Sequence, residues 1–176
     1  LSPLEGFPGD SQPLGRVRGR GFQKAPRGFM FLSLGGLVVE IGKLDHIGVA
    51  VRDMERAIAQ YEKTLGGKVR SRHPNHKGEV DAAFVLIGDT AIEFLAPTKE
   101  GSVMDKFLEK RGEGIHHLAY EVPDIHRAVH TLIQDGLTPL DKEPRPGILG
   151  ELIFFFHPKS THGVLIELVE ATPEGV

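Results

Sequence analysis

Residues 44–57 read LDHIGVAVRDMERA, and residues 115–128 read IHHLAYEVPDIHRA. The second stretch repeats the first at an offset of 71 residues. Five positions are identical in the two stretches: His46/His117, Val51/Val122, Asp53/Asp124, Arg56/Arg127 and Ala57/Ala128. Such self-similarity indicates two copies of one structural unit, which bury their apolar faces against each other.

A shorter repeat follows each long one and carries a carboxylate. Residues 92–95 read IEFL and residues 166–169 read IELV, so their glutamates occupy equivalent positions. If the two copies pack around a pseudo-twofold axis, two histidines and two glutamates can converge on one point. The sequence therefore predicts a metal site whose ligands are His46, Glu93, His117 and Glu167.

The strand that carries each histidine has an alternating pattern. In residues 46–51, the branched apolar side chains share one face, while His46 shares the other with Gly48 and Ala50. The histidine face carries only small neighbours, which leaves room for a bound group. In residues 117–122, alternation assigns His117 to the register of His46 and directs His116 to the opposite side of the strand.

Each copy continues with a helix and three strands. Asp53 suits a helix N-cap, apolar residues recur at helical spacing over residues 54–65, and Gly66-Gly67 ends the helix. Asp124 and residues 125–133 repeat this pattern, and Gly136 stops the second helix. A linking helix covers residues 102–111 and opens with Ser102. The expected strands cover residues 46–51, 68–73, 79–87 and 90–96 in the first copy and 117–122, 138–142, 151–156 and 163–169 in the second.

This order of elements predicts an α+β fold with two tandem βαβββ modules. The modules should form one cupped, open barrel around the metal site. We assign residues 1–40 to an N-terminal extension, 41–98 to the first module, 99–113 to the linking helix and 114–172 to the second module.

The first 40 residues differ in composition from the rest. They contain eight Gly and four Pro, and residues 11–39 hold five basic side chains and no acidic one. This composition predicts a disordered segment, for example sequence upstream of a true start at Met30. An organelle-targeting segment is the alternative, since the region is rich in Arg and lacks acids. A secretory signal is the least supported interpretation, because the apolar run 29–39 contains a Gly pair and no clear cleavage site.

The overall composition excludes several classes of function. With 176 residues, 40% of them hydrophobic, and a net charge of -3, the chain can bury one compact core and has no basic excess for nucleic acid. The absence of cysteine excludes disulfides, thiolate ligands and thiol nucleophiles. No stretch approaches the roughly 20 apolar residues that cross a bilayer. We expect a cytoplasmic protein, with the mitochondrial matrix as the alternative.

The predicted ligand set has a defined chemistry. Imidazole and carboxylate without sulfur suit hard or borderline ions such as Mn, Co, Ni, Fe, Zn and Mg. Four protein ligands on an ion that prefers six leave two positions for a chelating substrate, which favours stabilisation of an enolate. A proton-transferring base is also needed, and the candidates are Glu167 and Asp81, with a plain surface position as the alternative for Asp81. We interpret the remaining histidines as solvated: His73, His76, His126, His130, His157 and His162.

Four segments carry a resemblance to a known family. LDHIGVAV, AIEFLAP, GIHHLAYEVPDI and FFFHPKSTHGVLIELVE resemble the methylmalonyl-CoA epimerase family of the vicinal oxygen chelate superfamily. The resemblance extends from residue 43 to about residue 170. It implies interconversion of (2R)- and (2S)-methylmalonyl-CoA through an enolate chelated to a divalent metal ion such as Co, Mn, Ni, Mg or Zn. It also implies a homodimer.

The resemblance assigns roles to individual residues. His46, His117 and Glu167 match the family's metal ligands, and Glu93 matches a position that supplies a Gln or Glu ligand. Glu167 also matches a catalytic acid/base, and Asp81 falls where some members place a second catalytic Glu. Lys159 and the loop 145–150 are candidates for substrate contact on loop position.

Other functions on the same fold compete with this one. Glyoxalase I uses His and Glu ligands in the same four places and also forms an enolate, so the ligands do not exclude it. The HHLA and HPKS segments favour the epimerase. A ring-cleaving dioxygenase needs only two His and one Glu, and a non-catalytic small-molecule binding protein would need no metal ligands at all.

Overall fold

The computed structural model describes residues 30–32 and 39–171. The helical elements are α1 (Met54–Leu65), α2 (Val103–Arg111), α3 (Ile125–Gln134) and the 3₁₀ turn η1 (Pro158–Ser160). The strands are β1 (Met30–Leu32), β2 (Val39–Ile41), β3 (Leu44–Ala50), β4 (Lys68–His76), β5 (Val80–Ile87), β6 (Thr90–Pro97), β7 (Gly114–Val122), β8 (Arg145–Pro146), β9 (Leu152–Phe156) and β10 (Ile166–Glu170).

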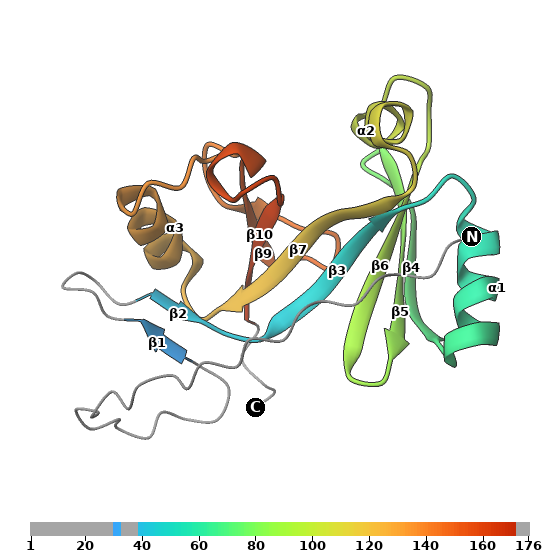
Figure 1. The fold of residues 1–176 in the computed structure, drawn as a ribbon, viewed down its shortest axis with the longest axis horizontal. Coiled ribbons are helices and arrows are strands. Elements are labelled where there is room, and N and C mark those ends of the chain that lie inside the picture. Colours follow the sequence, from blue (N-terminus) through green and yellow to red (C-terminus); the bar gives the residue numbers. More distant parts are fainter. Residues whose placement is uncertain (1–29, 33–38, 172–176) are drawn as a thin grey trace, which may run out of the picture.

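Eight strands form one continuous sheet in the order β4-β5-β6-β3-β7-β10-β9-β8. Antiparallel pairing of β3 with β7 at the centre joins the first copy of the repeat to the second (Figure 1). The sheet curls into an open half-barrel, and the helices lie around it (Figure 1). The predicted α+β fold of two tandem βαβββ modules in a cupped, open barrel is therefore confirmed.

Strand pairing has the same register in both copies. In the first copy β3 runs parallel to β6 and pairs Gly48 with Glu93. In the second, β7 runs parallel to β10 and pairs Ala119 with Glu167. Gly48 and Ala119 each stand two residues after the histidine of their copy, and residues two apart on a strand share a face. Each glutamate is thus placed on the face of the sheet that carries its own histidine.

Two helices cover the other face of the sheet, one for each copy (Figure 1). Ile58 of α1 is buried against Val85 and Phe94. Ile125 of α3 is buried in a second cluster with Phe154, Phe156 and Leu168. This burial removes the apolar stripes of both amphipathic helices from water and holds the sheet in its curled shape.

The predicted helix signals act as expected. The side chain of Asp53 accepts a hydrogen bond from the backbone N–H of Arg56, and the side chain of Asp124 accepts one from Arg127. Gly66 has a φ of 67°, a left-handed conformation that favours glycine, and it ends α1. Ser102 caps α2, which packs Met104 and Leu108 into a separate cluster of buried residues.

The structure differs from the expected elements in two places. The strand expected over residues 138–142 is absent from the described chain except for one bridge between Pro139 and Phe156, because proline has no N–H to extend a ladder. The strand that borders β9 is instead the two-residue β8. Within the expected N-terminal extension, β1 pairs with β2 in an antiparallel sheet, and residues 1–29 and 33–38 lie outside the described residues.

Across residues 30–32 and 39–171, no helix is long and apolar enough to span a membrane.

Candidate metal centre

Four buried polar side chains meet on the concave side of the sheet, and they are the four predicted ligands. His46 comes from β3, Glu93 from β6, His117 from β7 and Glu167 from β10. Each exposes no more than 4% of its surface. Buried ionisable groups are costly unless they are paired or bind a metal, so this burial points to a built site.

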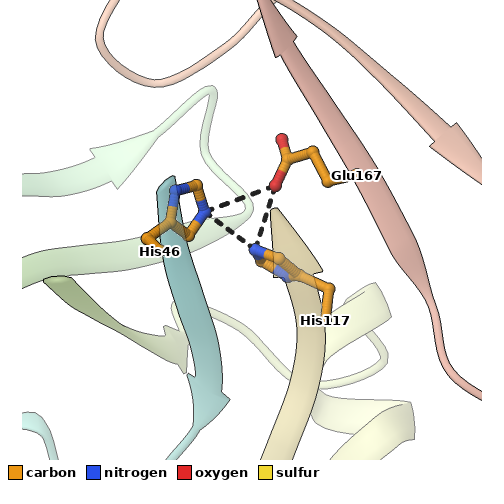
Figure 2. A group of neighbouring side chains, drawn as sticks. All are labelled: His46, His117 and Glu167. Atoms are coloured by element: carbon orange, nitrogen blue, oxygen red, sulfur yellow. Dashed lines mark hydrogen bonds and ion pairs between the residues drawn. The ribbon is translucent and has the colours of Figure 1, made fainter. Parts of the chain in front are cut away.

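The atoms that face each other are the distal ring nitrogens and one carboxylate oxygen from each glutamate. The two Nε2 atoms of His46 and His117 lie 3.0 Å apart. Glu167 Oε2 lies 3.3 Å from the first and 3.0 Å from the second (Figure 2). Glu93 Oε2 lies 3.4 Å and 3.3 Å from the same two nitrogens.

Three of the four side chains form the tightest group. One ligand atom each from His46, His117 and Glu167 lies within 4.8 Å of the other two, which is close enough for one ion to contact all three. These residues could hold a divalent metal ion. Glu93 approaches both imidazoles from its own strand and stands outside this tightest group.

The charges in the cluster show what kind of ion would fit. Burial favours the neutral forms of the two glutamates, but their hydrogen bonds with the imidazoles outweigh this effect. These hydrogen bonds lower the pKa of Glu93 to about 2 and also lower the pKa of Glu167. Burial likewise lowers the pKa of each imidazole, but the hydrogen-bonded carboxylates raise it to about 12 for His46 and about 9 for His117. The lowered pKa values leave the two carboxylates as two negative charges that need a positive partner. A divalent cation would supply two positive charges while both imidazoles serve as neutral ligands.

The small residues beside the histidines hold the imidazole rings. His117 pairs with Gly48 across β3 and β7, and His46 pairs with Ala119. A Cβ atom at Gly48 would lie 2.2 Å from Cε1 of His117, so the ring occupies the space that a side chain would take. The sequence pattern suggested room for a bound group at this place, and that interpretation was wrong: the ring of the other copy's ligand fills it.

Two β-bulges place one further side chain beside each histidine. The pairing of β3 with β7 shifts register twice, once at Asp45 and once at His116. These residues are equivalent in the repeat, since each precedes the histidine of its copy. A bulge sets one extra residue against the partner strand and re-aims its side chain. The prediction that His116 points away from His117 was therefore wrong, because strict alternation fails at the bulge.

Each bulged residue contacts the proximal nitrogen of the histidine that follows it. The Nδ1–H of His46 donates to Asp45 Oδ2 at 2.8 Å. Nδ1 of His117 lies 2.9 Å from Nδ1 of His116. A hydrogen bond at Nδ1 fixes the ring and its tautomer and leaves Nε2 free to face a cation. For His117 to present Nε2 in this way, its Nδ1–H must donate to an unprotonated Nδ1 of His116.

Replacing Asp45 by asparagine should weaken metal binding. The amide is a poorer acceptor than the carboxylate, so His46 would lose charge-assisted orientation and become a less basic ligand. We expect metal affinity to fall about 10-fold or more, in the range that loss of such a partner costs. Isothermal titration with Mn²⁺ or Co²⁺ would measure it. An unchanged affinity would show that Asp45 does not orient the ring.

A cavity of about 310 Å³ opens above the cluster. Its walls are mainly apolar and include Phe84, Leu95, Met104, Ile153 and Phe155. The rings of Phe84 and Phe155 meet His46 and His117 edge-on, with centroids 5.5 Å and 5.6 Å apart. An apolar cavity with a few convergent polar groups is the usual form of a small-molecule site.

The cavity includes some predicted contact residues and not others. Arg145, Gly147 and Ile148 from the loop 145–150 line it, whereas Lys159 does not. His76, which we interpreted as solvated, also lines it.

Asp81 is the predicted catalytic residue that the structure does not bring into the cavity. Its neighbours Val80 and Phe84 line the cavity, and Phe84 pairs directly with Glu93. Because side chains alternate along β5, Asp81 lies on the opposite face, which it shares with Ala83 under α1. The hypothesis that Asp81 points into the cup depended on the register of β5, because a shift of one residue moves each side chain to the opposite face of the sheet.

The interpretation of the sequence did not single out Asp45, directed His116 to the wrong side of its strand and did not single out Glu151. The first two could have been found from the repeat itself, since they correspond at the same offset as the two histidines. Glu151 has no equivalent signal, because it lies in the turn before β9, where the two copies differ.

Comparisons with known proteins agree with this geometry. Residues 45–156 match the glyoxalase/bleomycin resistance protein/dioxygenase superfamily. The ethylmalonyl-CoA/methylmalonyl-CoA epimerase of Cereibacter sphaeroides is 42% identical over 130 residues, which cover 73% of this chain and 97% of that protein.

Solved structures are similar over the same region. The methylmalonyl-CoA epimerase from Mycobacterium tuberculosis superposes with a TM-score of 0.71 and 37% identity, covering 76% of this chain and 91% of that one. A methylmalonyl-CoA epimerase in complex with methylmalonyl-CoA and NH4+ superposes with a TM-score of 0.70 and 36% identity, covering 75% and 96%. This chain therefore belongs to the glyoxalase/bleomycin resistance protein/dioxygenase superfamily and, within it, to the methylmalonyl-CoA epimerase family.

Proposed function

We propose that this chain is a metal-dependent epimerase that interconverts the (2R) and (2S) forms of methylmalonyl-CoA. One observation carries the proposal: two histidines and two glutamates converge, with their facing atoms 3.0–3.4 Å apart, at the base of an apolar cavity in a chain of this family. A related structure holds methylmalonyl-CoA itself, which supports an acyl-CoA as the ligand of this cavity.

The residues of the cavity suit proton removal next to a thioester. Apolar walls exclude water, which strengthens every electrostatic interaction inside the site. Glu167 lines the cavity, so its carboxylate could accept the C2 proton of a substrate. The developing oxyanion requires positive charge close by. A divalent ion held by His46, His117 and Glu93 would supply that charge.

We propose His46, Glu93, His117 and Glu167 as the ligands of a divalent ion. When bound, such an ion supplies Lewis-acid stabilisation of the oxygen that gains charge. Mixed imidazole and carboxylate ligands without sulfur suit Co, Mn, Ni, Mg or Zn. The homodimer that the resemblance implies stays a prediction, which sedimentation equilibrium would test.

Proton NMR of methylmalonyl-CoA in deuterated water tests the proposed function. Metal-loaded protein should remove the C2 proton signal, and chelator-treated protein should not, because the carbanion would then lack its counter-charge. Restoration of exchange by Co²⁺ or Mn²⁺ is the matched control. Absence of exchange with every divalent ion would contradict the epimerase. The hemithioacetal of glutathione would then be the substrate to test, since glyoxalase I uses the same ligand positions.

A further inference from the structure

One carboxyl group of the cavity has no role in the ligand cluster. Glu151 stands immediately before β9, and it lines the cavity together with Ile153 and Phe155. These three residues are spaced by two, so their side chains lie on the same face of the β9 segment, which is the face that lines the cavity. Glu151 therefore belongs to the wall of the candidate active site.

The Glu151 carboxyl is also incompletely bonded. Its Oε2 atom is the single buried side-chain nitrogen or oxygen, within residues 30–32 and 39–171, that has no hydrogen-bond partner. A buried polar atom without a partner is costly, and a catalytic role is one of the physical explanations for it. An acyl group that enters the cavity could supply the missing contact.

The surroundings raise the pKa of this carboxyl. Burial raises the pKa of Glu151, and the negative charges of Glu167 and Asp45 raise it further, although its own backbone N–H and His46 act in the opposite direction. A carboxyl group that keeps its proton can donate it to a carbanion. Glu167, which lines the same cavity, is the complementary acceptor.

The two carboxyls enter the same cavity from different positions on the β9–β10 side of the sheet. Glu167 of β10 pairs with Phe155 of β9. Glu151 stands four residues before Phe155, which is roughly 13 Å along an extended chain. The two side chains thus enter the cavity from different levels along β9, so they can approach a bound acyl group from different directions.

No other carboxyl that lines the cavity meets these conditions. Four carboxylates line it: Glu79, Glu93, Glu151 and Glu167. Glu93 and Glu167 belong to the cluster, and Glu79 is exposed to solvent. Asp81, the residue that the sequence suggested, is on the other face of β5.

We propose that Glu151 is the second acid–base group of the epimerisation and acts on C2 from the side opposite Glu167. This inference rests on the proposed function. In one direction, the Glu167 carboxylate takes the C2 proton, and the C–H electron pair moves toward the thioester carbonyl. The Glu151 carboxylic acid then gives its proton to the other face of C2, and the electron pair returns to form the new C–H bond. In the reverse direction the two residues exchange roles.

The test uses the variant Glu151→Gln with full metal occupancy, and each epimer of methylmalonyl-CoA is incubated separately in deuterated water. Epimerisation, followed with a coupling enzyme that consumes one epimer, should fall by at least about 100-fold. Deuterium should still enter C2 with retention of configuration in the epimer whose proton faces Glu167, because that residue can remove and return a proton alone. Glu143→Gln, on the exposed loop before β8, is the matched control and should behave like the unmodified protein.

Three outcomes would overturn the assignment. The first is epimerisation by Glu151→Gln at the rate of Glu143→Gln. The second is an equal loss of exchange in both epimers with unchanged metal content, which would show that Glu151 binds substrate or supports the fold. The third is exchange without inversion in Asp81→Asn and not in Glu151→Gln. If the unmodified protein itself exchanges neither epimer, the proposed function fails before the question of Glu151 arises.

Discussion

Replacement of Glu167 by alanine should abolish epimerisation. The change removes one of the three side chains in the tightest group and also the carboxylate proposed to accept the C2 proton. Loss of a general base alone costs about 10²–10⁴-fold in rate. Loss of a ligand should weaken metal binding by more than the about 10–100-fold that loss of an outer hydrogen-bond partner costs. Turnover assays and metal titration of the same preparation would measure both effects.

The matched control is the equivalent glutamate of the first copy. Glu93 contacts the same two ring nitrogens as Glu167, at 3.4 Å and 3.3 Å. Glu93→Gln and Glu167→Gln preserve the shape of the side chain and remove its charge. At saturating metal we expect Glu93→Gln to recover most of its turnover and Glu167→Gln to recover little. Equal recovery by both variants would show that Glu167 is a ligand only and would remove the base from the mechanism.

Replacement of Gly48 by alanine should have the second largest effect. The added Cβ would lie 2.2 Å, 2.4 Å and 2.6 Å from three atoms of the His117 ring, a distance that side chains do not adopt. The ring must move, and with it the Nε2 atom that lies 3.0 Å from both its histidine and glutamate partners. We expect metal affinity to fall by at least about 100-fold, the upper end for loss of ligand orientation. Titration with Co²⁺, whose absorption reports ligand geometry, would detect the change.

Ala119→Gly is the control for this substitution. Ala119 occupies the equivalent place in the second copy, where it pairs with His46. Removing its methyl group creates no clash, so metal affinity should stay near that of the unmodified protein, although stability should fall by roughly 0.5–1 kcal/mol. If Gly48→Ala binds metal normally, the small residue at that position is not required for the ring of His117.

The repeat carried most of the information about the site. Residues at matching positions in two copies of a fold must occupy matching places, so the repeat alone was enough to group His46 and His117 with Glu93 and Glu167. The helix caps Asp53 and Asp124 were equally predictable, because capping depends on residues within one turn of each other. The helix caps were predictable because their contacts are local, and the four site residues were predictable because their positions are duplicated in the two copies.

The orientations of His116 and Asp81 could not be predicted from the sequence, because the pairing between strands decides where these side chains point. His116 turns toward His117 because one extra residue bulges out of the pairing of β7 with β3. Asp81 lies on the face of β5 opposite the cavity because Phe84 pairs with Glu93, which sets the face of every residue in β5. Both depend on the register between strands, and a shift of one residue inverts every side chain.

The internal repeat was enough to predict the two-copy architecture and the four side chains that meet at its centre, since a repeated pattern of strand, cap and helix indicates repeated modules. The orientation of those side chains depends on how the strands pair in three dimensions. The tertiary structure placed Asp45 and His116 against the imidazoles, closed the His117 ring onto Gly48 and brought Glu151 to the wall of the cavity. The physical reason is that these contacts join segments distant in sequence, and their geometry arises only when strands pair, bulge and curl around a common core.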